Sequence, residues 1–185
     1  MLHAATPADL EFIRRALGEG AADGSFDPEL AGVGAEASLF YANLGEALRT
    51  GDLRMPDDDG NLTRLVHVAG YVYSASAGMP PVGFGLFKSL GSNGFELWLT
   101  GIAASARGHG HGHAMLGELL ATPAGQMACL IRCNRESTTA ETAVRLFGKF
   151  GFALCRATPA VLWLVNSKAP PDLIAQIATS PTIGL

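Results

Sequence analysis

The order of the segments along this chain predicts a mixed α/β fold, in which helices flank a central, mostly antiparallel sheet. Two observations support this prediction. After a short strand pattern at residues 2–5, two helical patterns come before three strand patterns, and the strands at 65–72 and 82–88 are close enough to form a hairpin. Strand and helix patterns then alternate as far as residue 165. We therefore expect one domain over residues 1–165, with six or seven strands and about four helices, and a C-terminal tail over 166–185.

Apolar residues at helical spacing predict four helices. The first begins near Thr6, because threonine suits an N-cap and the proline after it suits the first helical position. The second covers about 36–49 and stops at Gly51. The third follows Gly112, and the fourth covers 139–150. The strand patterns cover residues 2–5, 65–72, 82–88, 95–103, 127–133, 152–156 and 160–165.

Composition and charge argue against several classes of function. The formal net charge is -4 and the 13 lysines and arginines are scattered, so we expect no nucleic-acid partner. The chain has no apolar run near the roughly 20 residues of a membrane span and no signal-peptide pattern, so we expect no membrane partner. The three cysteines lack paired spacing, which is typical of reduced thiols. A cytoplasmic protein is the resulting expectation.

The most informative segment is Arg107-Gly-His-Gly-His-Gly-His113, which joins an apolar strand to a helix. Its glycines let the backbone bend and let a ligand approach the main chain closely. Successive N–H groups at the start of a helix bind anions, and the helix dipole adds to this attraction. The segment lacks the lysine of a Walker loop and the glycine spacing of a dinucleotide fingerprint. The pattern therefore predicts a pyrophosphate site of another kind.

Several segments resemble the GCN5-related N-acetyltransferase (GNAT) family. Arg107-Gly-His-Gly-His-Gly112 is similar to the family signature Arg/Gln-x-x-Gly-x-Gly/Ala, and it follows a strand as that signature does. Ala143-Val-Arg-Leu-Phe-Gly-Lys-Phe-Gly-Phe152 resembles the Gly-Phe ending of the family's fourth helix. The likeness covers residues 2–165 in the family's order. It implies the GNAT fold and an acetyl-CoA-dependent N-acetyltransferase that acts on a primary amine of an unidentified acceptor.

The resemblance also implies which residues hold acetyl-CoA, the co-substrate. Residues 107–113 would hold the pyrophosphate of coenzyme A, mostly through main-chain N–H groups, at Arg107, Gly108, His109, Gly110, His111, Gly112 and His113. The Arg107 side chain would add a positive charge next to the phosphates. The backbone at the end of the preceding strand would hold the pantetheine arm, at Thr100, Gly101 and Ile102. In the family, a neighbouring backbone N–H polarises the thioester carbonyl. The acceptor amine belongs to either a small molecule or a protein.

Glu96 is the candidate general base that takes a proton from the attacking amine. Strand alternation would place four side chains on one face, those of Glu96, Trp98, Thr100 and Ile102. Glu96 would then lie ~13 Å from Thr100 along the strand, so a water molecule would relay the proton. Some members of the family use a glutamate on this strand. An ordinary polar role near the start of the strand is the competing interpretation of Glu96.

The general acid is missing from the place where the family often has it. The family often carries a tyrosine shortly before the Gly-Phe ending, and this chain has Phe147 there, which cannot donate a proton. Either another hydroxyl protonates the departing thiolate or the thiolate leaves unaided, which a pKa of about 8.5 allows near neutral pH. The candidate hydroxyls belong to Tyr41, Tyr71, Tyr73 and Ser137. Phe147 also supports an alternative, a degenerate member that binds acyl-CoA or a partner without turnover.

Three further patterns each allow two interpretations. The alternating histidines 109, 111 and 113 would face one way in an extended segment and suit zinc or nickel, but no thiol lies nearby, so we predict no metal site. Asp57-Asp58-Asp59 either attracts a cationic amine or forms a solvated turn. The tail after Val165 either covers the domain or contributes to a homodimer.

Overall fold

The computed structural model describes residues 1–32, 34–55 and 64–179. The cluster Asp57-Asp58-Asp59 therefore lies outside the described residues, and its two interpretations stay open. Within the described part of the chain, no helix is long and apolar enough to cross a membrane.

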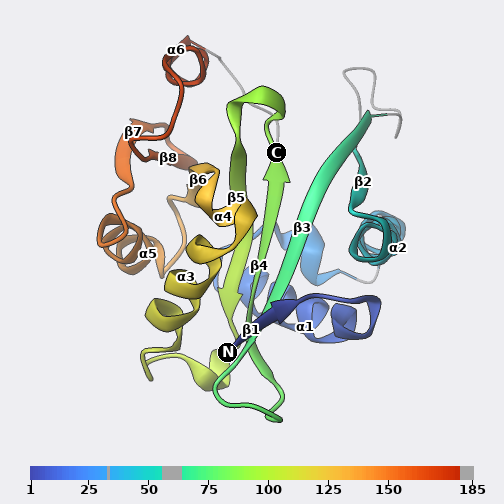
Figure 1. The fold of residues 1–185 in the computed structure, drawn as a ribbon. Helices are drawn as coiled ribbons and strands as arrows, with labels where there is room; N and C mark the ends of the chain where they lie inside the picture. The colour runs from blue at the N-terminus through green and yellow to red at the C-terminus, as the bar shows by residue number, and fades with distance from the viewer. Residues whose placement is uncertain (33, 56–63, 180–185) are drawn as a thin grey trace.

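A single mixed sheet forms the centre of the molecule (Figure 1). Its strands run in the order β1-β3-β4-β5-β6-β8-β7, and β2 pairs with β3 off this path. Only β5 and β6 pair in parallel among the described strands, which confirms the predicted mixed, mostly antiparallel sheet. The strands are β1 Leu2–Ala4, β2 Asp52–Met55, β3 Arg64–Ser74, β4 Pro81–Ser89, β5 Phe95–Ile102, β6 Ala128–Asn134, β7 Ala153–Ala157 and β8 Val161–Val165.

Helices cover both faces of this sheet. The helices α1 and α2 pack on one face, and α3 and α5 pack on the other (Figure 1). The α-helices are α1 Leu10–Ala22, α2 Ala35–Thr50, α3 His111–Ala121, α4 Pro123–Gln126, α5 Ala140–Gly148 and α6 Pro171–Thr179. Short 3-10 helices cover Pro7–Asp9, Pro28–Ala31, Gly91–Asn93 and Ala104–Ala106.

Local chemistry sets the helix ends that the sequence predicts. The Asp9 carboxylate accepts hydrogen bonds from the Thr6 N–H and hydroxyl, both at 2.9 Å, and this capping box starts the first helical segment. Gly51 ends α2 with a φ of 87°, a left-handed conformation that glycine adopts without a Cβ penalty. The predicted second helix is thereby confirmed to within one residue at each end.

The apolar core is divided between the two faces of the sheet. On the α1–α2 face, Leu17 and Leu44 pack against Phe84 and Leu86 of β4. On the α3–α5 face, a second cluster is built from residues such as Phe87, Leu97, Leu116, Leu119, Ile131, Phe147 and Leu164. Because β4 and β5 supply side chains to both clusters, the middle of the sheet is buried on both sides and is held rigidly.

Three elements are absent from the sequence-based prediction, namely β2, α4 and α6. The helix α6 lies in the predicted tail, where Leu173 and Ile177 pack against Leu130 and Trp163 of the sheet. This part of the tail therefore covers the domain, one of the two expected roles, and it shares the domain's core. The homodimer prediction is a separate matter that this packing does not test.

Candidate functional site

The strands β5 and β6 part in the middle of the sheet. Their parallel pairing covers Phe95–Leu97 of β5 and Ala128–Ile131 of β6, whereas β5 continues to Ile102 and β6 to Asn134. Beyond Leu97 and Ile131, β6 pairs only with β8 among the described strands. We call the gap between the two diverging strands the wedge, and the point where they part its apex. Backbone groups of β5 on the β6 side of the wedge have no strand partner there.

A β-bulge in β5 interrupts the alternation of side chains that the sequence predicts. Leu86 pairs with Leu99 and Phe87 pairs with Leu97, so Trp98 is an extra residue in β5. As a result, Leu99 packs on the α1–α2 face, whereas both Leu97 and Ile102 pack on the α3–α5 face.

The prediction that Glu96, Trp98, Thr100 and Ile102 share one face is therefore wrong. Glu96 and Trp98 lie on the α1–α2 side, where Lys88 contacts both, and Thr100 and Ile102 lie on the other side. The physical reason is the extra residue, because a single inserted residue reverses the alternation for all that follow it.

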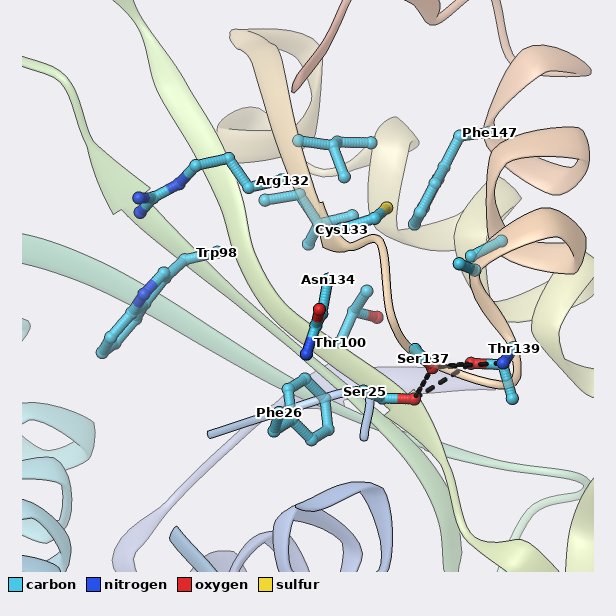
Figure 2. A pocket seen from close by; sticks show the side chains of 14 residues that line it. Ser25, Phe26, Trp98, Thr100, Arg132, Cys133, Asn134, Ser137, Thr139 and Phe147 are labelled. Carbon is cyan, nitrogen blue, oxygen red and sulfur yellow. Dashed lines mark hydrogen bonds between the residues drawn. The ribbon is translucent and has the colours of Figure 1, made fainter. Parts of the chain in front are cut away.

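The wedge contains a cavity of about 100 Å³ (Figure 2). Side chains from both strands line it, and so do those from the segment after α1 and from the start of α5. Its lining includes Ser25, Phe26, Trp98, Thr100, Arg132, Cys133, Asn134, Ser137, Thr139 and Phe147. The cavity thus reaches both faces of the sheet, since Trp98 and Arg132 belong to one face and Phe147 belongs to the other.

Residues 107–113, which we call the glycine bend, lead from β5 to α3. Gly108 and Gly110 have φ values of 80° and 81°, and a Cβ at either position would meet no atom within 4 Å. None of the described residues accepts a hydrogen bond from the five amides of residues 108–112. The bend is largely exposed, so these amides are open at the amino end of an 11-residue helix. This geometry suits an anion.

The Arg107 side chain turns back onto the protein. Its Nε donates to the Ile102 carbonyl oxygen at 3.0 Å, and its Nη1 donates to Asp23 Oδ2 at 2.5 Å. Burial favours a higher pKa for Asp23, but hydrogen bonds from Ser25 and Arg107 outweigh it and hold the pKa below its ordinary value. Arg107 thus ties β5, the bend and the end of α1 together.

The segment 23–26, which we call the linker, crosses the open end of the wedge. Asn134 Nδ2 donates to the Gly24 carbonyl oxygen at 2.7 Å. The Ser25 hydroxyl lies 2.9 Å from both Ser137 Oγ and Thr139 Oγ1. Sequence reasoning did not place Asn134 or Ser25 at the site, because their partners are more than 100 residues away along the chain.

Asp23 determines which hydroxyl groups donate and which accept among Ser25, Ser137 and Thr139. Its carboxylate accepts from the Ser25 hydroxyl at 2.5 Å, which uses the only proton that Ser25 has. Ser25 must then accept from Ser137 or Thr139. The Ser25 proton therefore points toward Asp23. Ser137 Oγ also accepts a hydrogen bond from the Thr139 N–H at 3.1 Å and lies 3.0 Å from Thr139 Oγ1, and both residues line the cavity.

Glu96 lies at the apex with only 2% of its surface exposed. Arg132 Nε donates to Glu96 Oε1 at 2.6 Å and Nη2 donates to Oε2 at 3.2 Å, a forked ion pair. Lys88 Nζ lies 3.2 Å from Glu96 Oε2 and 5.1 Å from the centre of the Trp98 ring. Burial lowers the pKa of Lys88, and Arg132 acts in the same direction. We call these three charged residues the apex cluster.

The apex cluster affects whether Glu96 can act as the predicted general base. A general base needs contact with the proton that it removes, directly or through water. Glu96 is instead buried, faces away from Thr100 and is bound by two cations. The base role stays a prediction, and this geometry does not favour it.

The candidate acids lie in different parts of the molecule. Among the four, Ser137 lines the cavity, next to Thr139. Tyr41 donates to the Leu30 carbonyl oxygen at 2.6 Å, and burial raises the pKa of its hydroxyl. Tyr73 packs beside His111, and Tyr71 packs beside Phe87. Phe147 is buried and lines the cavity, as its place in the resemblance implies.

The three histidines of the glycine bend do not converge. His113 packs against Phe150 with ring centres 4.9 Å apart, whereas His111 lies beside Tyr73 and 6.2 Å from His109. Across the described residues, no group of three or more His, Cys, Asp or Glu side chains is placed to hold a metal ion. The helical turn at His111 separates side chains that an extended segment would align.

Comparison with known proteins shows which solved structures have a similar fold. No protein-family model and no curated protein sequence matches the chain. Solved structures do match. A ribosomal-protein-alanine N-acetyltransferase from Brucella melitensis is 17% identical, with a TM-score of 0.59 over 89% of this chain and 97% of that one. The PaiA N-acetyltransferase from Thermoplasma acidophilum, in complex with coenzyme A, is 13% identical, with a TM-score of 0.57 over 90% and 98%.

A third neighbour is a GCN5-related N-acetyltransferase from Kribbella flavida, which is 17% identical, with a TM-score of 0.57 over 89% of this chain and 95% of that one. At such low identity the similarity concerns the fold. The predicted GNAT fold is confirmed, with eight strands in the described part of the chain rather than six or seven. This chain therefore shares its fold with solved N-acetyltransferases, one of which is a GCN5-related N-acetyltransferase.

Proposed function

We propose that this protein is an acetyl-CoA-dependent N-acetyltransferase that transfers the acetyl group directly to a primary amine. One observation carries the proposal. A wedge between two central strands contains a cavity that is open to solvent, and the strand β5 beside it leads to a helix whose first amides have no partner among the described residues. A long, thin co-substrate with a diphosphate at one end and a reactive thioester at the other fits such an arrangement. A neighbour with this fold was solved in complex with coenzyme A.

The glycine bend supplies the diphosphate site in this proposal. The amides of residues 108–112 are open and the α3 dipole points at them. The Arg107 side chain contributes indirectly, because it is already bound to Asp23 and Ile102 and fixes the path of the bend. His109, His111 and His113 contribute main-chain groups, as the resemblance implies.

The backbone of β5 supplies the site for the pantetheine arm. Thr100, Gly101 and Ile102 pair with β4 on one side and face the wedge on the other. An amide-containing chain can add to this free edge as a strand would. The Thr100 hydroxyl already donates to the Phe84 carbonyl oxygen at 2.9 Å, so its role at the site is through the backbone.

The reaction requires no enzyme nucleophile. The neutral amine attacks the thioester carbonyl, a C–N bond forms, the C–S bond breaks and coenzyme A leaves as a thiolate. The nitrogen, which becomes positively charged on attack, gives up one proton to water, and the product is the neutral amide. Holding both reactants together in the wedge provides much of the rate enhancement. A backbone N–H directed at the developing oxyanion is typically worth roughly 3–4 kcal/mol.

The leaving thiolate and the attacking amine each place a requirement on the site. The thiolate, with a pKa of about 8.5, can leave unaided, which is compatible with Phe147 in the cavity wall. The hydroxyl oxygens of Ser137 and Thr139 line the cavity, where they can accept a hydrogen bond from the incoming amine in addition to the one that Ser137 Oγ accepts from the Thr139 N–H. In this proposal these oxygens orient the amine, which arrives deprotonated.

Two measurements test the proposal. Isothermal titration calorimetry with coenzyme A should show binding to the wild-type protein. Release of free thiol from acetyl-CoA should then depend on an amine from a panel of amino acids, polyamines, aminoglycosides and peptides. Absence of coenzyme A binding would contradict the proposal.

A second candidate function is a degenerate member that binds acyl-CoA or a partner without turnover. Phe147 favours it, because the cavity wall offers no phenol at that position. Tight coenzyme A binding with no thiol release across the panel would support this alternative. A cytoplasmic location, a homodimer and the identity of the amine stay predictions to be tested with the purified protein.

A further inference from the structure

We propose that Glu96 is a positioning residue, which clamps β4, β5 and β6 at the apex and so sets the opening of the wedge for coenzyme A. This inference rests on the proposed function for its ligand. It assigns to Glu96 a role through its neighbours rather than through contact with the reacting atoms.

The position of the cluster is the first argument. Lys88 of β4 lies directly opposite Glu96 of β5 in the antiparallel register. Arg132 of β6 is the residue that follows Ile131, where the pairing with β5 ends. The Glu96 carboxylate therefore binds one side chain from each flanking strand at the point where two of the strands begin to part.

Burial and charge are the second argument. The Arg132 side chain is 7% exposed and that of Lys88 is 10% exposed. Both cations thus contact the Glu96 carboxylate with little water to screen them, and burial lowers the pKa of Lys88. Without the carboxylate, Lys88 and Arg132 would repel each other across β5, because both lie on the same face beside it.

Packing on the opposite face is the third argument. Leu97 and Ile131, the last pair before the wedge opens, are buried in the cluster that also contains Phe147. The apex is therefore held by the charged clamp on one face and by apolar contacts on the other. Since Thr100, Cys133 and Asn134 line the cavity just beyond it, a change at the apex alters the distance between the cavity walls.

The clamp and the base hypotheses predict different pH profiles. A base is needed less as the pH rises and the amine deprotonates by itself, so a Glu96→Gln deficit would shrink. A clamp acts through geometry, so the deficit is independent of pH between 6 and 9. Among the described residues, the charged and titratable groups that act on Glu96 include Lys88 and Arg132, and Arg64 and Cys129 act on the cluster at longer range.

The experiment measures the Kd of coenzyme A for Glu96→Gln, Arg132→Met and the double variant. We expect each single variant to weaken binding by at least about tenfold, and the double variant to bind no more weakly than the weaker single one. Glu96→Asp, which keeps the charge, should recover part of the affinity. Glu141→Gln, in an exposed pair with Arg145, is the control and should bind as the wild type does.

The contrary result is equally specific. An unchanged Kd for Glu96→Gln, together with a rate deficit that disappears at high pH, would overturn the clamp and support the base. If a single variant does not fold, the double variant Glu96→Leu, Arg132→Met removes the charges of Glu96 and Arg132 together. The clamp hypothesis predicts that this double variant has a higher Kd for coenzyme A. The base hypothesis predicts a slower reaction with an unchanged Kd.

A ligand-independent measurement separates this inference from the proposed function. Hydrogen exchange should become faster in residues 98–102 and 132–134 of Glu96→Gln, while α1 keeps its protection. If the wild type binds no coenzyme A, the proposed function fails, and hydrogen exchange still decides the clamp. Unchanged exchange at both strand segments would refute it.

Discussion

The glycine bend and the apex cluster stand at the two ends of the same strand, β5, and they use different parts of the chain. The bend is exposed, contains positive-φ glycines and presents main-chain amides. The apex cluster is buried and consists of charged side chains that bind one another. The first region is ready for a ligand, whereas the second is complete within the protein. One strand thus leads to unpaired main-chain amides at one end and carries a buried group of paired charges at the other.

Removal of the carboxylate at the apex should have the largest effect on stability. Glu96→Ala leaves Lys88 and Arg132 buried beside each other, so we expect a loss of about 3–5 kcal/mol in the free energy of unfolding. Urea denaturation followed by circular dichroism measures it. Glu141→Ala, which breaks an exposed pair with Arg145, should fall within experimental error of the wild type. Equal losses for the two variants would remove the distinction between buried and exposed charge.

At the bend, conformation rather than charge should decide the effect of a substitution. Gly110 has a φ of 81°, which a β-branched residue adopts at a cost of roughly 1.5–3 kcal/mol. We expect Gly110→Val to weaken coenzyme A binding by about 10–100-fold in calorimetry.

Gly112 provides the matched control, because its φ lies outside the left-handed region. An added Cβ there would meet Leu146 and Ile102 at 3.6 and 3.8 Å, which is ordinary contact. Gly112→Ala should therefore bind within about threefold of the wild type. A large loss for Gly112→Ala with none for Gly110→Val would show that the backbone conformation of the bend is not what the ligand requires.

The same contrast explains how far the sequence predicts this molecule. The bend could be predicted because its chemistry is local: spaced glycines, a strand before it and a helix after it. The order of strands and helices followed from periodicity for the same reason. The extra residue at Trp98 could not be predicted, because a bulge is defined by the pairing of Leu86 and Phe87 on another strand.

The side chains at the site show the same limit. Glu96 was identified as functional from its place on β5, but its setting depends on Lys88 and Arg132, which are 8 and 36 residues away. The linker contacts of Asn134 span 110 residues. The conformation of the bend could be predicted from local sequence, whereas the surroundings of buried side chains depend on tertiary neighbours.

Cys133 is a partly buried titratable group that lines the cavity in the wedge, so it allows the comparison to be tested through pH. Burial raises the pKa of its thiol from 9.0 to about 12. The unfolded chain therefore loses this proton first, and the stability that Cys133 contributes falls as the pH rises from 9 toward 12. We expect the free energy of unfolding to decline by at most about 1.4 kcal/mol per pH unit from this group.

Cys133→Ala should flatten that decline in chemical denaturation measured between pH 8.5 and 10.5. Some slope should remain, because burial also raises the pKa of Cys129. The comparison uses slopes, since the smaller alanine side chain lowers stability equally at every pH. Identical slopes for the variant and the wild type would mean that the Cys133 thiol is more accessible to water than its place in the wedge suggests.

The smallest effect should come from Asp23, which joins the linker to the glycine bend through Ser25 and Arg107. Its pKa is lowered in the folded protein, so its contribution is present above pH 3.8 and is lost as the pH falls below that value. Asp23→Asn should cost a few tenths to about 1 kcal/mol at pH 7, because the pair with Arg107 is partly exposed, and nothing at pH 2. Denaturation at both pH values measures the difference. A pH-independent loss would show that Asp23 acts through hydrogen bonds that asparagine cannot replace, and would make the linker contact one of shape rather than charge.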